Sequence, residues 1–217
     1  HETGGKLSEE TVAWMKTQLE EAKKQGVTVI PVSHHNLLDE STLYPEECTI
    51  ENTKEVTALL EAYGVPVYLS GHLHLQRIKK HTSNLNTPGG YGIREIVTSP
   101  LPMAPCQYSI LNWQADGSLS YHTKKVDIAG WAQRYGEEDE NLLNFDAYAD
   151  QFLVDVISEQ AFKALQSASK DIKEEMARLY ADMNRDYCSG TKIDVAKIRK
   201  SEAYQNWIRY SGNGFWL

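Results

Sequence analysis

The spacing of apolar residues predicts two helix–strand pairs at the start of the chain. Residues 8–26 and 53–63 repeat apolar side chains at helical spacing, and capping or glycine residues lie at their ends. Apolar runs follow each helix, at residues 27–32 and 65–70, and they predict buried strands. The helix–strand–helix–strand order predicts parallel strands that are joined by helical crossovers.

In the middle of the chain, apolar residues recur at the shorter spacing that is typical of strands. Four strands are predicted, at residues 75–81, 92–98, 107–114 and 118–126, and turn-forming residues separate them. Asp116 and Gly117 between the last two strands are typical of a β-hairpin. Consecutive strands with short turns favour an antiparallel continuation of the sheet.

From residue 128 onward the pattern is helical. Phe145, Tyr148, Phe152 and Val156 recur at helical spacing, and the apolar face then drifts to Ile157, Ala161 and Leu165. We interpret this stripe as a core face. An oligomer surface and a lid over the functional site are the alternatives. A charged break at residues 136–140 leads us to divide the chain into a first domain, residues 1–137, and a helical extension, residues 138–217.

Composition removes several classes of function. The chain has 22 basic and 30 acidic residues, a net charge of −8, which disfavours a nucleic-acid polymer as partner. No apolar run approaches the roughly 18 residues of a membrane-spanning helix. The three cysteines show no disulfide or zinc-knuckle spacing. Without an initiator Met or a signal peptide, we expect the chain to begin inside a longer protein, whose compartment, cytoplasmic or exported, stays open.

Four of the seven histidines lie directly after the two predicted buried strands. His34 and His35 follow the first strand, and His72 and His74 follow the second. Ligands of open α/β sheets bind beyond the carboxyl ends of strands, and imidazole is a common ligand of borderline metals. We therefore predict that both stretches meet at one metal centre, with Gly71 permitting a sharp turn beside the ion.

The stretch Val29-Ile30-Pro31-Val32-Ser33-His34-His35, followed by Gly71-His72-Leu73-His74, resembles the calcineurin-like metallophosphoesterase family, as does the upstream helix that contains Trp14. The resemblance covers residues 7–126. It implies an α/β (α+β) fold that is part of an αββα sandwich, followed by the all-helical C-terminal region.

The same resemblance implies a centre of two divalent ions, Mn, Fe or Zn. His34 and His72 would bind one ion and His74 the other, while His35, Asn36 and Gly71 would touch the substrate or support the ligands. From the residues alone, His35 is as readily a packing histidine and Asn36 a loop-turn residue.

The chain departs from the family in one large respect. The family's first three motifs, Asp-x-His, Gly-Asp and Gly-Asn-His-Asp/Glu, do not occur in it. We therefore expect a C-terminal piece of a longer enzyme, whose acid–base histidine lies upstream of this chain. With three imidazoles and no carboxylate, the chain alone is expected to bind metal weakly or not at all.

Two functions are carried forward from the sequence. In the first, the full-length protein uses a metal-activated hydroxide to hydrolyse phosphate mono- or diesters, with cyclic nucleotides as one candidate substrate. In the second, the chain is a non-catalytic binding or dimerisation module built on a decayed phosphoesterase half. A homodimer through the helical extension is the expected protein partner.

Overall fold

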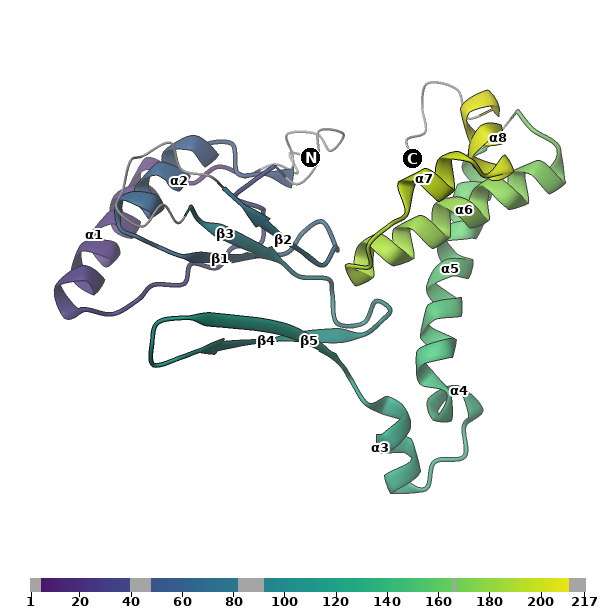
Figure 1. The fold of residues 1–217 in the computed structure, drawn as a ribbon, viewed down its shortest axis with the longest axis horizontal. Helices are drawn as coiled ribbons and strands as arrows, with labels where there is room; N and C mark the ends of the chain where they lie inside the picture. The colour runs from purple at the N-terminus through teal and green to yellow at the C-terminus, as the bar shows by residue number, and fades with distance from the viewer. Residues whose placement is uncertain (1–4, 40–47, 82–91, 166, 211–217) are drawn as a thin grey trace. The chain divides into compact units, whose positions relative to one another are not determined.

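The computed structural model describes residues 5–39, 48–81, 92–165 and 167–210 (Figure 1). It divides into two compact units, His1–Ser99 and Pro100–Leu217. The predicted mixed α+β class with a helical C-terminal region is confirmed. The αββα sandwich is not confirmed, because the described strands form a three-stranded sheet and a separate two-stranded sheet. The division at residue 137 into a first domain and an extension stays a prediction.

The first unit contains two helices and a small mixed sheet. The helices are α1 (Glu9–Gln25) and α2 (Thr53–Ala62), and the strands are β1 (Val67–Ser70), β2 (Arg77–Lys80) and β3 (Arg94–Val97). The strand order is β1-β3-β2, with β1 parallel to β3 and β2 antiparallel to it. The predicted helices and these three strands are confirmed.

Local signals set the ends of α1 as expected from the sequence. The Ser8 Oγ accepts a hydrogen bond from the Thr11 amide at 3.1 Å, which satisfies one free donor of the first turn. Gly26 ends the helix in the left-handed conformation, with φ +67°. Leu19 and Ala22 face the core of the unit.

The predicted buried strand at residues 27–32 is wrong. Val32 forms an isolated parallel bridge with Leu69, and the side chains of Val27 and Val32 are 56% and 73% exposed. Two backbone hydrogen bonds of 3.0 Å join this segment to β1, from Ser33 N to Leu69 O and from Leu69 N to Pro31 O. Pro31 has no N–H to extend the ladder, so the segment lies extended at the edge of the sheet.

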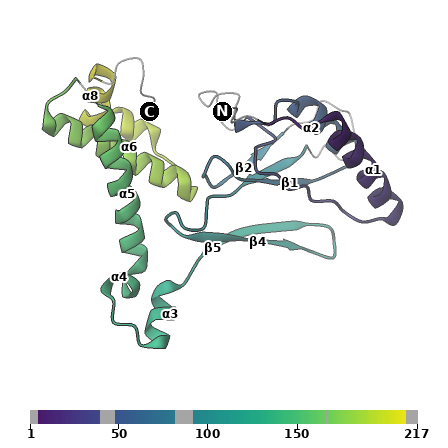
Figure 2. The same cartoon turned by 180° about the vertical axis from the view of Figure 1, so that it is seen from behind.

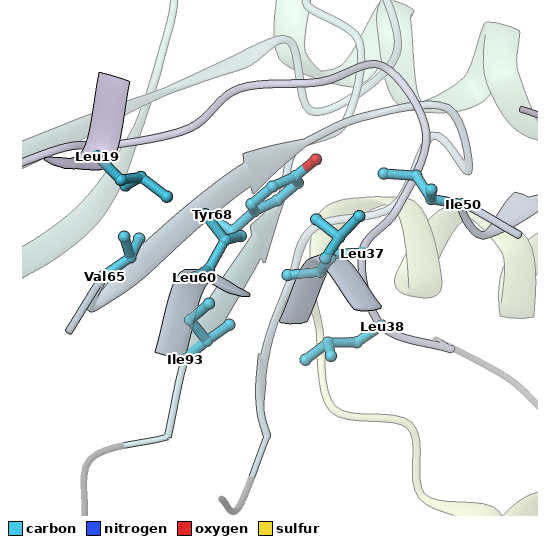
Figure 3. Packing of buried hydrophobic residues seen from close by; sticks show 9 residues of the cluster. Leu19, Leu37, Leu38, Ile50, Leu60, Val65, Tyr68 and Ile93 are labelled. Carbon is cyan, nitrogen blue, oxygen red and sulfur yellow. The ribbon is translucent and has the colours of Figure 1, made fainter. Parts of the chain in front are cut away.

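The core of the first unit lies where the two helices and the loop after Asn36 meet the sheet. Figure 3 shows this cluster, to which α2 contributes Leu60 and β1 contributes Tyr68. Leu37 and Leu38 from the loop are buried in the same cluster. Each large apolar side chain buried in this way contributes roughly 1.5–3 kcal/mol, so the core fixes the chain directly after residue 36.

The second unit begins with a β-hairpin and continues as helices (Figure 2). The hairpin consists of β4 (Gln107–Trp113) and β5 (Leu119–Lys125), paired antiparallel. Its predicted turn is confirmed, with Gly117 at φ +81° and the Ser118 amide donating to Asp116 Oδ1 at 2.9 Å. The helices are α3 (Ile128–Tyr135), α4 (Glu140–Leu143), α5 (Phe145–Ala164), α6 (Lys170–Ser189), α7 (Val195–Arg199) and α8 (Glu202–Tyr210).

A small aromatic core holds the later helices together. Leu165, Met176 and Trp207 are buried in one cluster, and the Tyr180 ring stacks on Trp207 at 5.5 Å between centroids. The Gln107 side chain donates a hydrogen bond to the carbonyl of Ser189 at 3.2 Å. The hairpin and the end of α6 are therefore joined within this unit.

The core face predicted for α5 is placed differently. Tyr148 and Phe152 are 42% and 58% exposed, whereas the buried residues of α5 are Leu153, Val154 and Ala161. This helix is apolar on two faces, and periodicity alone does not tell which of them packs on α6. The interpretation as core is therefore wrong for Tyr148 and Phe152, and it is confirmed for Ala161 and Leu165, which are buried. Among the described helices, none is long and apolar enough to cross a membrane.

None of the three cysteines forms a disulfide, and their burial predicts their reactivity. Burial raises the pKa of the Cys188 thiol and of the Cys106 thiol, while Cys48 is half-buried. Because the thiolate is the reactive form, we expect Cys106 and Cys188 to react at least about 10-fold more slowly with a disulfide reagent at pH 8 than in guanidinium. Rapid labelling of Cys188 in the native protein would contradict its placement.

Candidate functional site

The structure brings three of the four clustered histidines into contact. The ring centroid of His72 lies 5.0 Å from that of His34 and 4.5 Å from that of His35. The ring centroids of His34 and His35 are 5.5 Å apart. His72 Nδ1 lies 3.1 Å from His34 Nε2. Two segments 38 residues apart in sequence therefore meet at one place, as their positions after neighbouring strands predicted.

The surroundings of His72 favour the neutral form of its ring. Its pKa is lowered from the ordinary value of about 6.5, first by burial and then by the positive charge that His35, His34 and His74 carry when protonated. A neutral imidazole carries one nitrogen lone pair, which can accept a proton or bind a metal ion.

The turn after β1 is made by histidines rather than by glycine. His72 and His74 have φ values of +66° and +55°, in the left-handed region, and the Leu73 amide donates to the Gly71 carbonyl at 2.8 Å. A Cβ at Gly71 would meet only the His34 carbonyl oxygen at 3.9 Å, an ordinary contact. In this turn the left-handed conformation is adopted by the two histidines, which carry a strain of roughly 1–2 kcal/mol each, and the role of Gly71 beside an ion stays a prediction.

His35 and Asn36 are placed by close contacts with residues distant in sequence. A Cβ at Gly5 would approach His35 Nδ1 to 3.1 Å, so this ring lies almost against the Gly5 backbone. Asn36 is wholly buried, and its Nδ2 donates to Ser70 Oγ at 2.9 Å. Asn36 therefore supports the turn that carries His72 from inside the unit.

A buried carboxylate that the sequence analysis missed lies behind this turn. Glu95 on β3 is wholly buried and accepts hydrogen bonds from the amides of Leu37 and Leu38, at 2.6 and 2.7 Å, and from Ser70 Oγ at 2.6 Å. Burial raises the pKa of the Glu95 carboxyl, and these hydrogen bonds oppose that rise. A charged residue inside the apolar strand at 92–98 was the available signal.

The pair formed by His34 and His72 fits two ligands of one ion. Two nitrogen ligands on a tetrahedral zinc ion, with bonds of about 2.0–2.1 Å, lie about 3.3 Å apart. The observed 3.1 Å between the two ring nitrogens is close to that separation, and it also fits a hydrogen bond between imidazoles. In the part of the chain that the structure describes, no group of three or more His, Cys, Asp or Glu side chains is placed to hold an ion. His74 is therefore not placed as a third ligand.

A comparison with family models identifies a similarity in the helical region. Residues 127–216 match the model of the C-terminal domain of cyclic nucleotide phosphodiesterase. The match runs from the N-cap of α3 past the end of α8, and it covers less than half of the chain. A comparison with curated proteins finds no match.

This result corrects the family inferred from the sequence. The matching model is that phosphodiesterase domain and not a calcineurin-like metallophosphoesterase, so the earlier assignment is wrong. It rested on two short histidine motifs, and motifs of this length recur in unrelated proteins. The two-ion centre that the resemblance implied has no support from the match, whereas the meeting of the histidine rings stands on the geometry.

Proposed function

We propose that this protein hydrolyses a phosphodiester bond of a cyclic nucleotide and that the cluster of His34, His35 and His72 is its active site. The contact between His34 and His72 is the observation that carries the proposal, because it joins a neutral imidazole to two others. The match of residues 127–216 to a cyclic nucleotide phosphodiesterase domain supports the substrate class.

The cluster supplies the proton transfers that such a hydrolysis needs. A neutral imidazole such as His72 takes a proton from water as the water oxygen attacks phosphorus. A protonated imidazole of the same cluster gives a proton to the leaving oxygen as its bond to phosphorus breaks. Proton transfer by positioned side chains of this kind typically contributes about 10²–10⁴-fold to a rate.

We also propose that His34 and His72 bind one divalent ion, Mn, Fe or Zn, and that His74 binds a second. When bound, such an ion lowers the pKa of a coordinated water and stabilises charge on phosphoryl oxygens. The spacing of the first two rings supports this part of the proposal. That the protein holds two ions stays a prediction.

Hydrolysis of a substrate panel tests the function. We expect turnover of 3′,5′- or 2′,3′-cyclic nucleotides, with a lower rate for a phosphate monoester. A His34→Gln variant is expected to lose at least about 100-fold in rate, because it removes one imidazole of the pair. The exposed His122 on β5 provides the matched control, His122→Gln. If the wild-type protein turns over no diester with or without added Mn²⁺, the proposal is overturned.

Metal removal separates the two parts of the proposal. If an ion is bound, dialysis against a chelator is expected to abolish turnover, and added Mn²⁺ or Zn²⁺ is expected to restore it. Turnover that persists after complete removal of metal contradicts the metal part and leaves the imidazoles as acid and base.

The exposed face of α5 favours a second candidate function, a dimerisation module. The rings of Tyr148 and Phe152 lie with centroids 6.1 Å apart, tilted by 31°, on a face where the described residues leave both exposed. If this face pairs with a second copy, sedimentation is expected to give a dimer that Phe152→Ser converts to a monomer. A monomeric wild-type protein at 100 µM would exclude this candidate.

A further inference from the structure

We infer that Glu95 is a positioning residue that holds the two histidine-bearing turns against each other. The inference rests on the proposed function only for what the histidines do. The placement of the rings is a separate and testable statement.

One carboxylate joins both turns. Glu95 Oε1 accepts from the Leu37 amide and from Ser70 Oγ, and Oε2 accepts from the Leu38 amide. The two amides follow His34 by three and four residues, and Ser70 precedes His72 by two. Both segments are therefore hydrogen-bonded to Glu95 on β3 at positions no more than four residues from their histidines.

Asn36 and Ser70 complete the network. The Ser70 hydroxyl donates to Glu95 and accepts from Asn36 Nδ2, which also lies 3.4 Å from the Gly71 carbonyl oxygen. Each donor in this chain has a defined acceptor, and bonds arranged in this way reinforce one another. Asn36 and Glu95 are wholly buried, so bulk water does not replace these partners.

The sheet itself holds the first turn weakly. The segment before His34 forms one isolated bridge to β1 in place of a ladder, and it lies at the edge of the sheet. The two amide hydrogen bonds to Glu95 come immediately after this segment. A backbone hydrogen bond of 3.1 Å from the Gly71 amide to the His34 carbonyl joins the two turns directly, and the carboxylate adds a second anchor from the next strand.

The test compares Glu95→Gln with a matched core variant, Val56→Ala. Glutamine keeps the size of the side chain but replaces one acceptor oxygen by an NH₂ group, so at least one donor loses its partner. Val56 on α2 is wholly buried in the same unit and takes no part in the network. Nitrogen–proton NMR correlations of the imidazole rings, recorded at a temperature where both variants are folded, report the placement of the rings directly.

We expect the His34 and His72 ring resonances to shift in Glu95→Gln and to stay in place in Val56→Ala. In a Co²⁺ titration, we expect affinity to fall about 10- to 100-fold in Glu95→Gln and to be unchanged in Val56→Ala. Ring resonances that are the same in Glu95→Gln and in wild type overturn the inference. If Glu95→Gln does not fold, Ser70→Ala decides, because it removes one arm of the network and is expected to shift the His72 ring.

The two proposals fail in different ways. A wild-type protein that hydrolyses no diester and binds no Co²⁺ refutes the proposed function, and the NMR comparison still decides the role of Glu95. Hydrolysis by the wild type with unshifted rings in the folded variants refutes only the positioning role.

Discussion

Replacing Glu95 by alanine is expected to lower the free energy of unfolding by at least about 3 kcal/mol, since three buried donors lose their acceptor at roughly 1–3 kcal/mol each. These donors are the Leu37 and Leu38 amides and the Ser70 hydroxyl. The side chain is wholly buried, so alanine also leaves a cavity behind the turn. Urea unfolding followed by circular dichroism measures the change.

An exposed carboxylate of the same unit is the control for loss of charge. Glu51 is exposed, and Glu51→Ala is expected to change the free energy of unfolding by no more than about 0.5 kcal/mol. A loss below about 1 kcal/mol in Glu95→Ala would mean that the network does not hold the loop in solution.

Replacing His72 by asparagine is expected to lower the rate of phosphodiester hydrolysis by at least about 100-fold without unfolding the protein. Burial and the neighbouring imidazoles lower the pKa of His72, and its ring contacts both other rings of the cluster. Asparagine is chosen because it tolerates the left-handed conformation that this position adopts, at φ +66°. The loss therefore reports the imidazole and not the turn.

The experiment has two controls, the melting temperature of the variant and the rate of a variant at a distant histidine. The melting temperature of His72→Asn is expected to stay within a few degrees of wild type, and His122→Asn is expected to keep the wild-type rate. Unchanged turnover in His72→Asn removes His72 from the active site.

Features set by neighbouring residues were predictable from the sequence. Both ends of α1 follow from Ser8 and Gly26, and the β4–β5 hairpin follows from Asp116 and Gly117. In these places the hydrogen bonds that decide the structure join residues close in sequence. The local sequence is therefore sufficient to predict these helix ends and this turn.

Features that depend on residues distant in sequence were not predictable. The apolar run at residues 27–32 predicted burial, but burial requires a second neighbour that the described residues do not place beside this edge. The burial of Tyr148 and Phe152 failed for a related reason, since α5 has a second set of apolar residues, Leu153, Val154 and Ala161, and these are the ones buried.

The candidate site shows the same division. The meeting of His34 with His72 was predicted from the position of both after apolar segments, and it is found although residues 27–32 form one parallel bridge to β1 and no strand. The role of Glu95 depends on the placement of β3 between β1 and β2, which no local pattern reveals. The family inferred from the histidine motifs was wrong because the motifs are short, whereas the match to residues 127–216 rests on a whole domain.

The most direct test of the central claim is a crystal structure of this protein soaked with vanadate, an oxyanion that resembles the phosphoryl group during hydrolysis. The account predicts density for the oxyanion within hydrogen-bond reach, about 2.6–3.2 Å, of a ring nitrogen of His34 or His72. Vanadate bound elsewhere while the rings of His34, His35 and His72 stay free would contradict the account.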